Sequence, residues 1–185
     1  NNENDFIKLY SRIQKYESIS DRMEIEIATY LSKLSEGRLS DESKHKIQQL
    51  MRAVTEIESI SDSCYNIART INRQQEQKVV LPDYLRENIL HMFKLLDKGV
   101  DEMIKILSAN KHVANFEIRN NINIELEINN YRNKLKTKNL VDVNDMKYKY
   151  ETSVIYMDII MECEKMGDYI INVVEAYKEI NIRNN

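Results

Sequence analysis

Apolar residues recur at alternating steps of three and four along most of the chain, which is the spacing of one face of an α-helix. Five stretches carry this stripe, and Gly37, Pro82 and short polar runs separate them. We therefore expect five helices at about residues 5–35, 41–73, 82–110, 112–138 and 143–180. Connections this short join antiparallel neighbours, so the sequence predicts an all-α fold, an antiparallel helical bundle.

Three residues are expected to mark helix starts. Ser40 is a typical N-cap, because its hydroxyl can accept a hydrogen bond from the first turn of the second helix. Pro82 lacks a backbone N–H and suits the start of the third helix. Asp142 is the expected cap of the fifth helix.

Composition agrees with the helical interpretation and limits the function. The 185 residues include only 3 Gly and 1 Pro, and 42% are hydrophobic, which suffices for a core. The net charge of −3 argues against a nucleic-acid partner. The chain has no apolar run near the roughly 20 residues of a membrane span, so we expect no direct membrane insertion by these residues.

A repeated acidic motif is the strongest indication of chemistry. Glu-Ser-Ile-Ser-Asp occurs twice, and Glu-Lys-Met-Gly-Asp is a third, related copy. A spacing of four residues places two carboxylates on one helix face, about 6 Å apart. Oxygen ligands in this arrangement suit hard or borderline metal cations. The candidate metal ligands are Glu17, Asp21, Glu58, Asp62, Glu164 and Asp168.

Helix rise predicts where these motifs meet. Counted from the first hairpin connection, the first two copies lie at nearly the same level, so their four acids should converge between helices one and two. Glu164 and Asp168 should face residues 117–121 of the fourth helix, where Arg119 would neutralise part of the acidic charge. We therefore expect the first cluster to bind a divalent or trivalent cation (iron, zinc, manganese or nickel) more strongly than the second.

The chain also contains an internal repeat. Glu58, Ser61, Asp62 and Asn66 match Glu164, Gly167, Asp168 and Asn172, and the fourth helix resembles the first in the same manner. This pattern predicts two units, residues 1–78 and 79–185, of which the first lacks an opening helix. We expect a longer protein to supply that helix upstream of Asn1.

Two other interpretations remain open. The acids could be structural, paired with basic residues in a metal-free scaffold or adaptor that mediates protein contacts. A carboxylate metalloenzyme is the weakest alternative, because the sequence offers no base at credible spacing and no nucleophile. We therefore expect a protein that is not an enzyme.

The repeated Glu-x-x-small-Asp motif, followed by Asn66 or Asn172, resembles the PhoU family. The sequence from about residue 9 to residue 177 is most similar to the cytoplasmic C-terminal PhoU-like domain of bacterial sodium/phosphate cotransporters. The resemblance implies two three-helix repeats, metal binding by the motif acids in some members, and control of phosphate uptake.

The same resemblance implies a location and partners. The chain would be a cytoplasmic domain of a bacterial inner-membrane protein, and its partner would be its own upstream transmembrane transporter domain. Assembly into a homodimer stays open. The sequence departs from the family pattern in its degenerate fourth motif and its absent helix.

Overall fold

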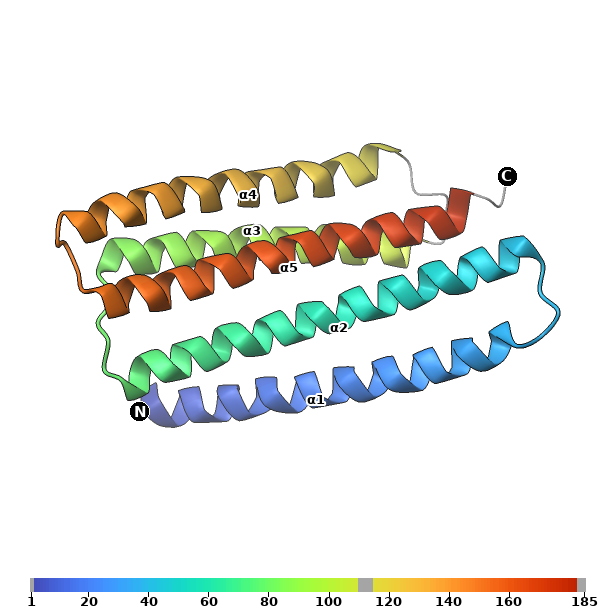
Figure 1. Cartoon of the computed structure of the whole chain (residues 1–185), viewed down its shortest axis with the longest axis horizontal. Helices are drawn as coiled ribbons and strands as arrows, with labels where there is room; N and C mark the ends of the chain where they lie inside the picture. Colours follow the sequence, from blue (N-terminus) through green and yellow to red (C-terminus); the bar gives the residue numbers. More distant parts are fainter. Residues whose placement is uncertain (1, 110–114, 183–185) are drawn as a thin grey trace.

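A computed structural model describes residues 2–109 and 115–182, and in these ranges the chain forms five long helices and no strand (Figure 1). About 90% of the residues are helical, which confirms the predicted all-α bundle. The helices are α1 (Asn2–Ser35), α2 (Asp41–Glu76), α3 (Asp83–Ser108), α4 (Asn115–Asn144) and α5 (Tyr150–Ile182).

Two of the expected helix starts are confirmed. The Ser40 side chain accepts a hydrogen bond from the backbone N–H of Ser43 at 3.2 Å, which satisfies a donor in the first turn of α2. Pro82 immediately precedes α3. The expected start of the fourth helix near His112 lies outside the described residues.

The prediction that Asp142 caps the fifth helix is wrong. Asp142 lies inside α4, and its buried carboxylate accepts hydrogen bonds from Lys147 Nζ at 2.6 Å and from the Tyr84 hydroxyl at 3.4 Å. The hydrogen bond from Lys147 is the main reason that the pKa of Asp142 is lowered. The carboxylate is therefore engaged with Lys147 and Tyr84 and does not cap α5; α4 continues to Asn144, and α5 begins only at Tyr150.

Helix α5 occupies the middle of the bundle. It packs against α2, α3 and α4, and α3 also packs against α4. Figure 1 places α1, α2, α5 and α4 side by side, with α3 behind α5. Among the described residues, α1 packs on α2 alone. The first helix is therefore attached to the bundle along one side only.

The hydrophobic core follows this arrangement. Its buried residues come mainly from α3, α4 and α5, and they include Met92, Ile128, Ile160 and Val173. In the described part of α1, Leu31 is the only buried hydrophobic residue. Helix α1 thus contributes little to the core, although its sequence also carries an apolar stripe.

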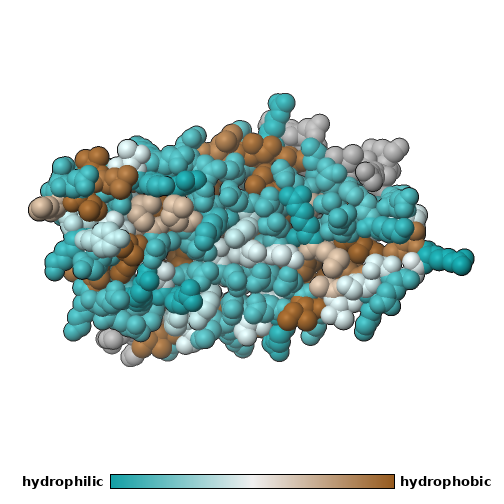
Figure 2. Space-filling view, in the orientation of Figure 1, coloured by the Kyte–Doolittle hydropathy of each residue, from teal (hydrophilic) through white to brown (hydrophobic). Residues whose placement is uncertain are grey.

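The surface of the bundle carries both polar and large apolar side chains. The face seen in Figure 2 is mostly hydrophilic, and apolar side chains appear there in separate patches. Within the ranges that the structure describes, no helix has the length and apolar character required to span a membrane.

The unequal core leads to a stability prediction. Ile128 is 1% exposed, whereas Ile27 on α1 is 36% exposed. Because Ile128→Ala leaves a cavity in a packed core, we expect it to lower the free energy of unfolding by about 2–4 kcal/mol. Ile27→Ala should cost less than about 1 kcal/mol. Urea unfolding followed by circular dichroism would measure both, and equal losses would contradict the described packing.

Candidate metal centre

Acids from the first two motif copies meet between α1 and α2. One carboxylate oxygen from each of Glu17, Asp21 and Asp62 lies within 4.8 Å of the other two. Glu17 and Asp21 are one turn apart on α1, and the antiparallel α2 brings Asp62 to the same level. The structure therefore brings together acids that the helix-rise argument placed at one height, while metal binding by them stays a prediction.

Glu58, the fourth acid expected here, is not one of the three whose oxygens lie within 4.8 Å of one another, but it hydrogen-bonds with Asp62. The pKa of Glu58 is raised to about 7, first by burial and then by the negative charge of Asp62 and a hydrogen bond with it. The charges of Glu24 and Asp21 act in the same direction. We call Glu17, Asp21, Glu58 and Asp62 the first cluster.

The pKa of Glu17 is also raised, for causes of the same kind. Its pKa is raised by burial and then by the charges of Asp21 and Asp62. Each acid that approaches the others thus makes ionisation of its neighbours more costly. A bound cation would reverse this effect, because it stabilises the ionised form of every ligand.

In the part of the chain that the structure describes, the acids of the first cluster have no basic partner. Within residues 2–109 and 115–182, no lysine or arginine forms an ion pair with any of its four acids. The nearest polar support is modest: the Ser59 hydroxyl donates a hydrogen bond to Glu58 at 3.5 Å. Like charges that are partly buried without a counter-ion lower stability, so this site favours a positive ligand.

The third motif copy has a different environment. Glu164 on α5 forms an ion pair with Arg132 on α4, and the two side chains are only 13% and 19% exposed. The pKa of Asp168 is raised by burial and by Glu164, whereas Arg132 acts to lower it. The pKa of Glu125 is also raised, first by burial and then by Asp168, Glu164 and Glu175. We call Glu125, Glu164 and Asp168 the second cluster.

The expected partners of the second cluster need correction. Glu164 and Asp168 lie near Glu125 and Arg132, about two turns beyond the expected segment 117–121. Asn121 instead donates a hydrogen bond to the backbone oxygen of Gly99 in α3, and the side chain of Glu117 lies outside the described residues. The reason is the length of α4, which continues to Asn144 and moves the hairpin connection toward the C-terminus.

The expected neutralisation of this cluster is present but comes from another arginine. Arg119 is exposed, and Arg132 supplies the positive charge. Arg132 stands seven residues after Glu125, and Leu31 stands seven residues after Glu24 in α1. A comparison of these two pairs in the sequence would have shown that the second hairpin has an arginine at this position and that the first hairpin has a leucine.

The small residue of the third motif has a packing role. A Cβ atom added at Gly167 would lie 3.1 Å from Cδ1 of Ile128 in α4, which is closer than ordinary contact. Gly167 therefore allows α4 and α5 to approach closely beside Glu164 and Asp168. This agrees with the interpretation that the small motif position permits close helix packing.

Comparisons with known proteins do not identify this chain. A scan against protein-family models and a search of curated proteins found no match. The resemblance to PhoU thus remains an interpretation of the motifs themselves.

The raised pKa of Glu58 leads to a prediction for metal-free protein. Folded Glu58 holds a proton up to about pH 7, whereas the unfolded chain releases it near its ordinary value of 4.5. The folded state therefore binds more protons in this window, and stability falls as the pH rises through it. Glu58→Gln should flatten this slope and raise Tm at pH 8 by about 2–4 °C, which corresponds to about 1 kcal/mol.

Thermal melts between pH 4 and pH 8 in a chelating buffer would measure the slope. Glu26→Gln is the matched control, because Glu26 is an exposed glutamate of the same hairpin outside the first cluster. An unchanged slope in Glu58→Gln would show that Glu58 ionises normally in the folded protein.

Proposed function

We propose that this chain is a regulatory, non-catalytic domain that binds a metal ion through its first cluster. The observation that carries the proposal is the meeting of three carboxylate oxygens from two helices within 4.8 Å. A second observation supports it: among the described residues an arginine pairs with the second cluster, whereas no lysine or arginine forms an ion pair with the first. The first cluster thus has the ligands and the charge deficit that a cation would satisfy.

The chemistry of the ligands favours hard cations. Carboxylate oxygens alone suit manganese or iron better than soft ions, and zinc and nickel usually take nitrogen or sulfur ligands as well. Glu17 and Asp21 lie on α1 while Glu58 and Asp62 lie on α2, so one ion would join the two helices. Metal binding would therefore strengthen the attachment of α1, which among the described helices packs on α2 alone.

We further propose that the domain regulates a sodium-dependent phosphate transporter. This step rests on the motif resemblance to the PhoU-like domains of such transporters. In this proposal the domain lies in the cytoplasm, its partner is the transmembrane part of the same bacterial inner-membrane protein, and the metal-dependent attachment of α1 is the signal that reaches the transporter.

Metal binding is tested directly by calorimetry. Titration of Mn²⁺ into the chain should show one site, and a variant carrying Glu17→Gln, Asp21→Asn, Glu58→Gln and Asp62→Asn should bind at least about tenfold more weakly, because four anionic ligands are gone. Iron, zinc and nickel titrations would then rank the cations.

A double variant of the second cluster, Glu164→Gln with Asp168→Asn, is the control and should keep the affinity of the unchanged chain. The proposal fails if none of these cations binds, or if the first-cluster variant binds Mn²⁺ as tightly as the unchanged chain. Both variants should first be shown to fold by circular dichroism.

The regulatory step has its own test. Uptake of radiolabelled phosphate should be measured in cells that produce the full-length protein, either unchanged or with the four first-cluster substitutions. If the metal-bound domain controls transport, the substitutions should change the uptake rate severalfold without changing the amount of protein in the membrane. An uptake rate that is the same for both proteins would contradict a regulatory role, even if the metal binds.

One observation favours a second candidate function. The Arg132–Glu164 ion pair makes the third motif copy a structural element of the α4–α5 interface. If the first cluster has an equally structural role, the chain is a metal-free scaffold or adaptor domain that mediates protein contacts. The calorimetric experiment separates the two candidates, because the scaffold binds none of the cations.

A further inference from the structure

The α1–α2 hairpin exposes a long apolar face. Met23 and Tyr30 of α1 are 55% and 63% exposed, and Leu50 and Ile57 of α2 are 40% and 43% exposed. Together with Leu9, Tyr16, Ile27 and Leu34, these residues form what we call the open face. Exposed apolar residues gathered in this way are typical of surfaces that bind a partner.

The internal repeat identifies which positions of the second unit correspond to the open face. In the register that matches Glu24 with Glu125, Met23 corresponds to Ile124 and Leu34 to Leu135. Ile124 is 4% exposed and Leu135 is 2% exposed, whereas Leu34 is 42% exposed. Residues of α1 that face solvent thus correspond to residues of α4 that belong to the core.

Helix α2 gives the same result independently. In the register that matches Glu58 with Glu164, Leu50 corresponds to Tyr156 and Ile57 to Cys163. Tyr156 is 1% exposed and Cys163 is 0% exposed. The α1–α2 hairpin therefore carries the apolar pattern of a covered hairpin without the element that covers it.

In the second unit, α3 is that element. It packs against both α4 and α5. A Cβ atom added at its Gly99 would lie 3.6 Å from Ile124 of α4 and 3.6 Å from Ile170 of α5. The corresponding residues of the first hairpin are Met23 and Cys64, and no helix of the described chain occupies the position equivalent to α3.

Two cavities mark this position between α1 and α3. One, of about 280 Å³, is lined by Ile13 of α1, Cys64 and Ala68 of α2, Phe93 of α3 and Met166 of α5. It is predominantly apolar, which suits side chains of another helix.

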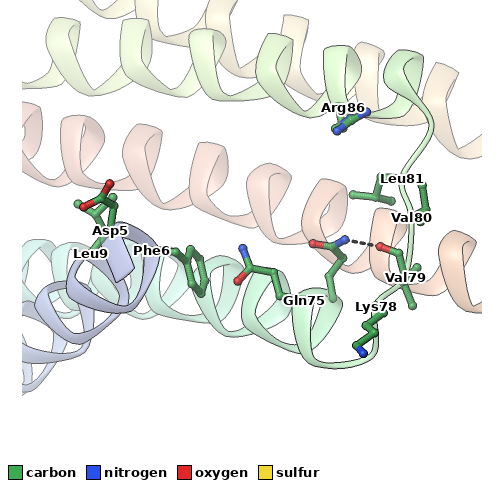
Figure 3. A pocket seen from close by; sticks show the side chains of 10 residues that line it. Asp5, Phe6, Leu9, Gln75, Lys78, Val79, Val80, Leu81 and Arg86 are labelled. Atoms are coloured by element: carbon green, nitrogen blue, oxygen red, sulfur yellow. Dashed lines mark hydrogen bonds between the residues drawn. The ribbon is translucent and has the colours of Figure 1, made fainter. Parts of the chain in front are cut away.

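The other cavity, of about 790 Å³, lies at the start of α1 (Figure 3). Phe6 and Leu9 of α1 line it on one side, Arg86 of α3 lines it on another, and Val79 and Leu81 lie in the connection that follows α2. The two cavities thus follow the same pair of helices, and we call the space between α1 and α3 the α1–α3 groove.

We propose that the α1–α3 groove and the open face bind an amphipathic helix of the α3 type. The length of α3, 26 residues, and its apolar stripe define the expected ligand. The acidic charge beside the open face further defines the expected ligand. Glu58 lies about 100° around α2 from Ile57, so the first cluster flanks the open face, and basic side chains at the edge of the bound helix would complement its acids. Helix α3 itself is of mixed charge, because Asp97, Asp101 and Glu102 offset Lys94, Lys98 and Lys105, so a peptide of its sequence tests the apolar stripe alone.

The α3 sequence supplies the probe. A fluorescein-labelled peptide of residues 83–108 is titrated with the 185-residue chain and followed by fluorescence anisotropy. We expect saturable binding, and hydrogen exchange of the amides in α1 and in the first half of α2 should slow in the complex. A peptide of the same composition whose apolar residues no longer follow the three–four spacing should not bind.

A matched pair of variants locates the binding site. Ile27→Asp places a charge in the open face and should weaken binding by about tenfold or more. Ile25→Asp makes the same substitution at a residue that is 63% exposed and points about 160° away around α1, so it should leave the affinity unchanged.

Three results would overturn the proposal. The first is that the peptide does not bind and leaves exchange in α1 unchanged. The second is that it binds Ile27→Asp as tightly as the unchanged chain, which would place it elsewhere on the bundle. The third is that sedimentation velocity finds a dimer of the chain that Ile27→Asp dissociates, because a second copy would then cover the open face.

Discussion

The packing of α5 against three other helices is the contact on which the rest of the structure depends. It joins the α1–α2 hairpin to the rest of the bundle through α2, and it contacts both α3 and α4. Ile159, Ile160 and Val173, which are almost completely buried, place an apolar surface on several sides of this one helix. Because α5 is covered from several directions, it can carry the charged residues Glu164 and Asp168 at an interface without losing its position.

The two acidic clusters show how a single position changes the electrostatics of a helix pair. In the second hairpin, Arg132 offsets the charge of Glu164 within the protein. The corresponding residue of the first hairpin is Leu31, which is buried and brings no charge. The first hairpin gains hydrophobic contact from Leu31 and keeps the repulsion among its carboxylates. The same backbone arrangement therefore yields one interface in which an arginine offsets the acidic charge and one in which the carboxylates repel each other.

Much of the fold could be predicted from the sequence, because apolar spacing, Ser40 and Pro82 all act locally. The level at which the first two motif copies meet also followed from helix rise alone. The end of α4 could not be predicted in this way. The carboxylate of Asp142 accepts hydrogen bonds from Lys147 and Tyr84, which lie outside α4, so Asp142 does not act as a helix cap. Because the end of α4 was predicted too early, Glu164 was expected to face the segment near Arg119, whereas its observed partner is Arg132. Errors in long antiparallel helices grow in this way, since a few residues at a connection change every facing pair.

The attachment of α1 along a single side has a consequence for how the molecule comes apart. Protein segments with few buried contacts open far more often than the core, and they do so as units. Helix α1 has one buried hydrophobic residue in its described part, while α5 lies among three neighbours. Local unfolding should therefore begin with α1 and leave the remaining four helices intact. How long α1 stays packed on α2 then depends on a few contacts between these two helices, including the stacked rings of Tyr10 and Tyr65, and not on the stability of the whole bundle.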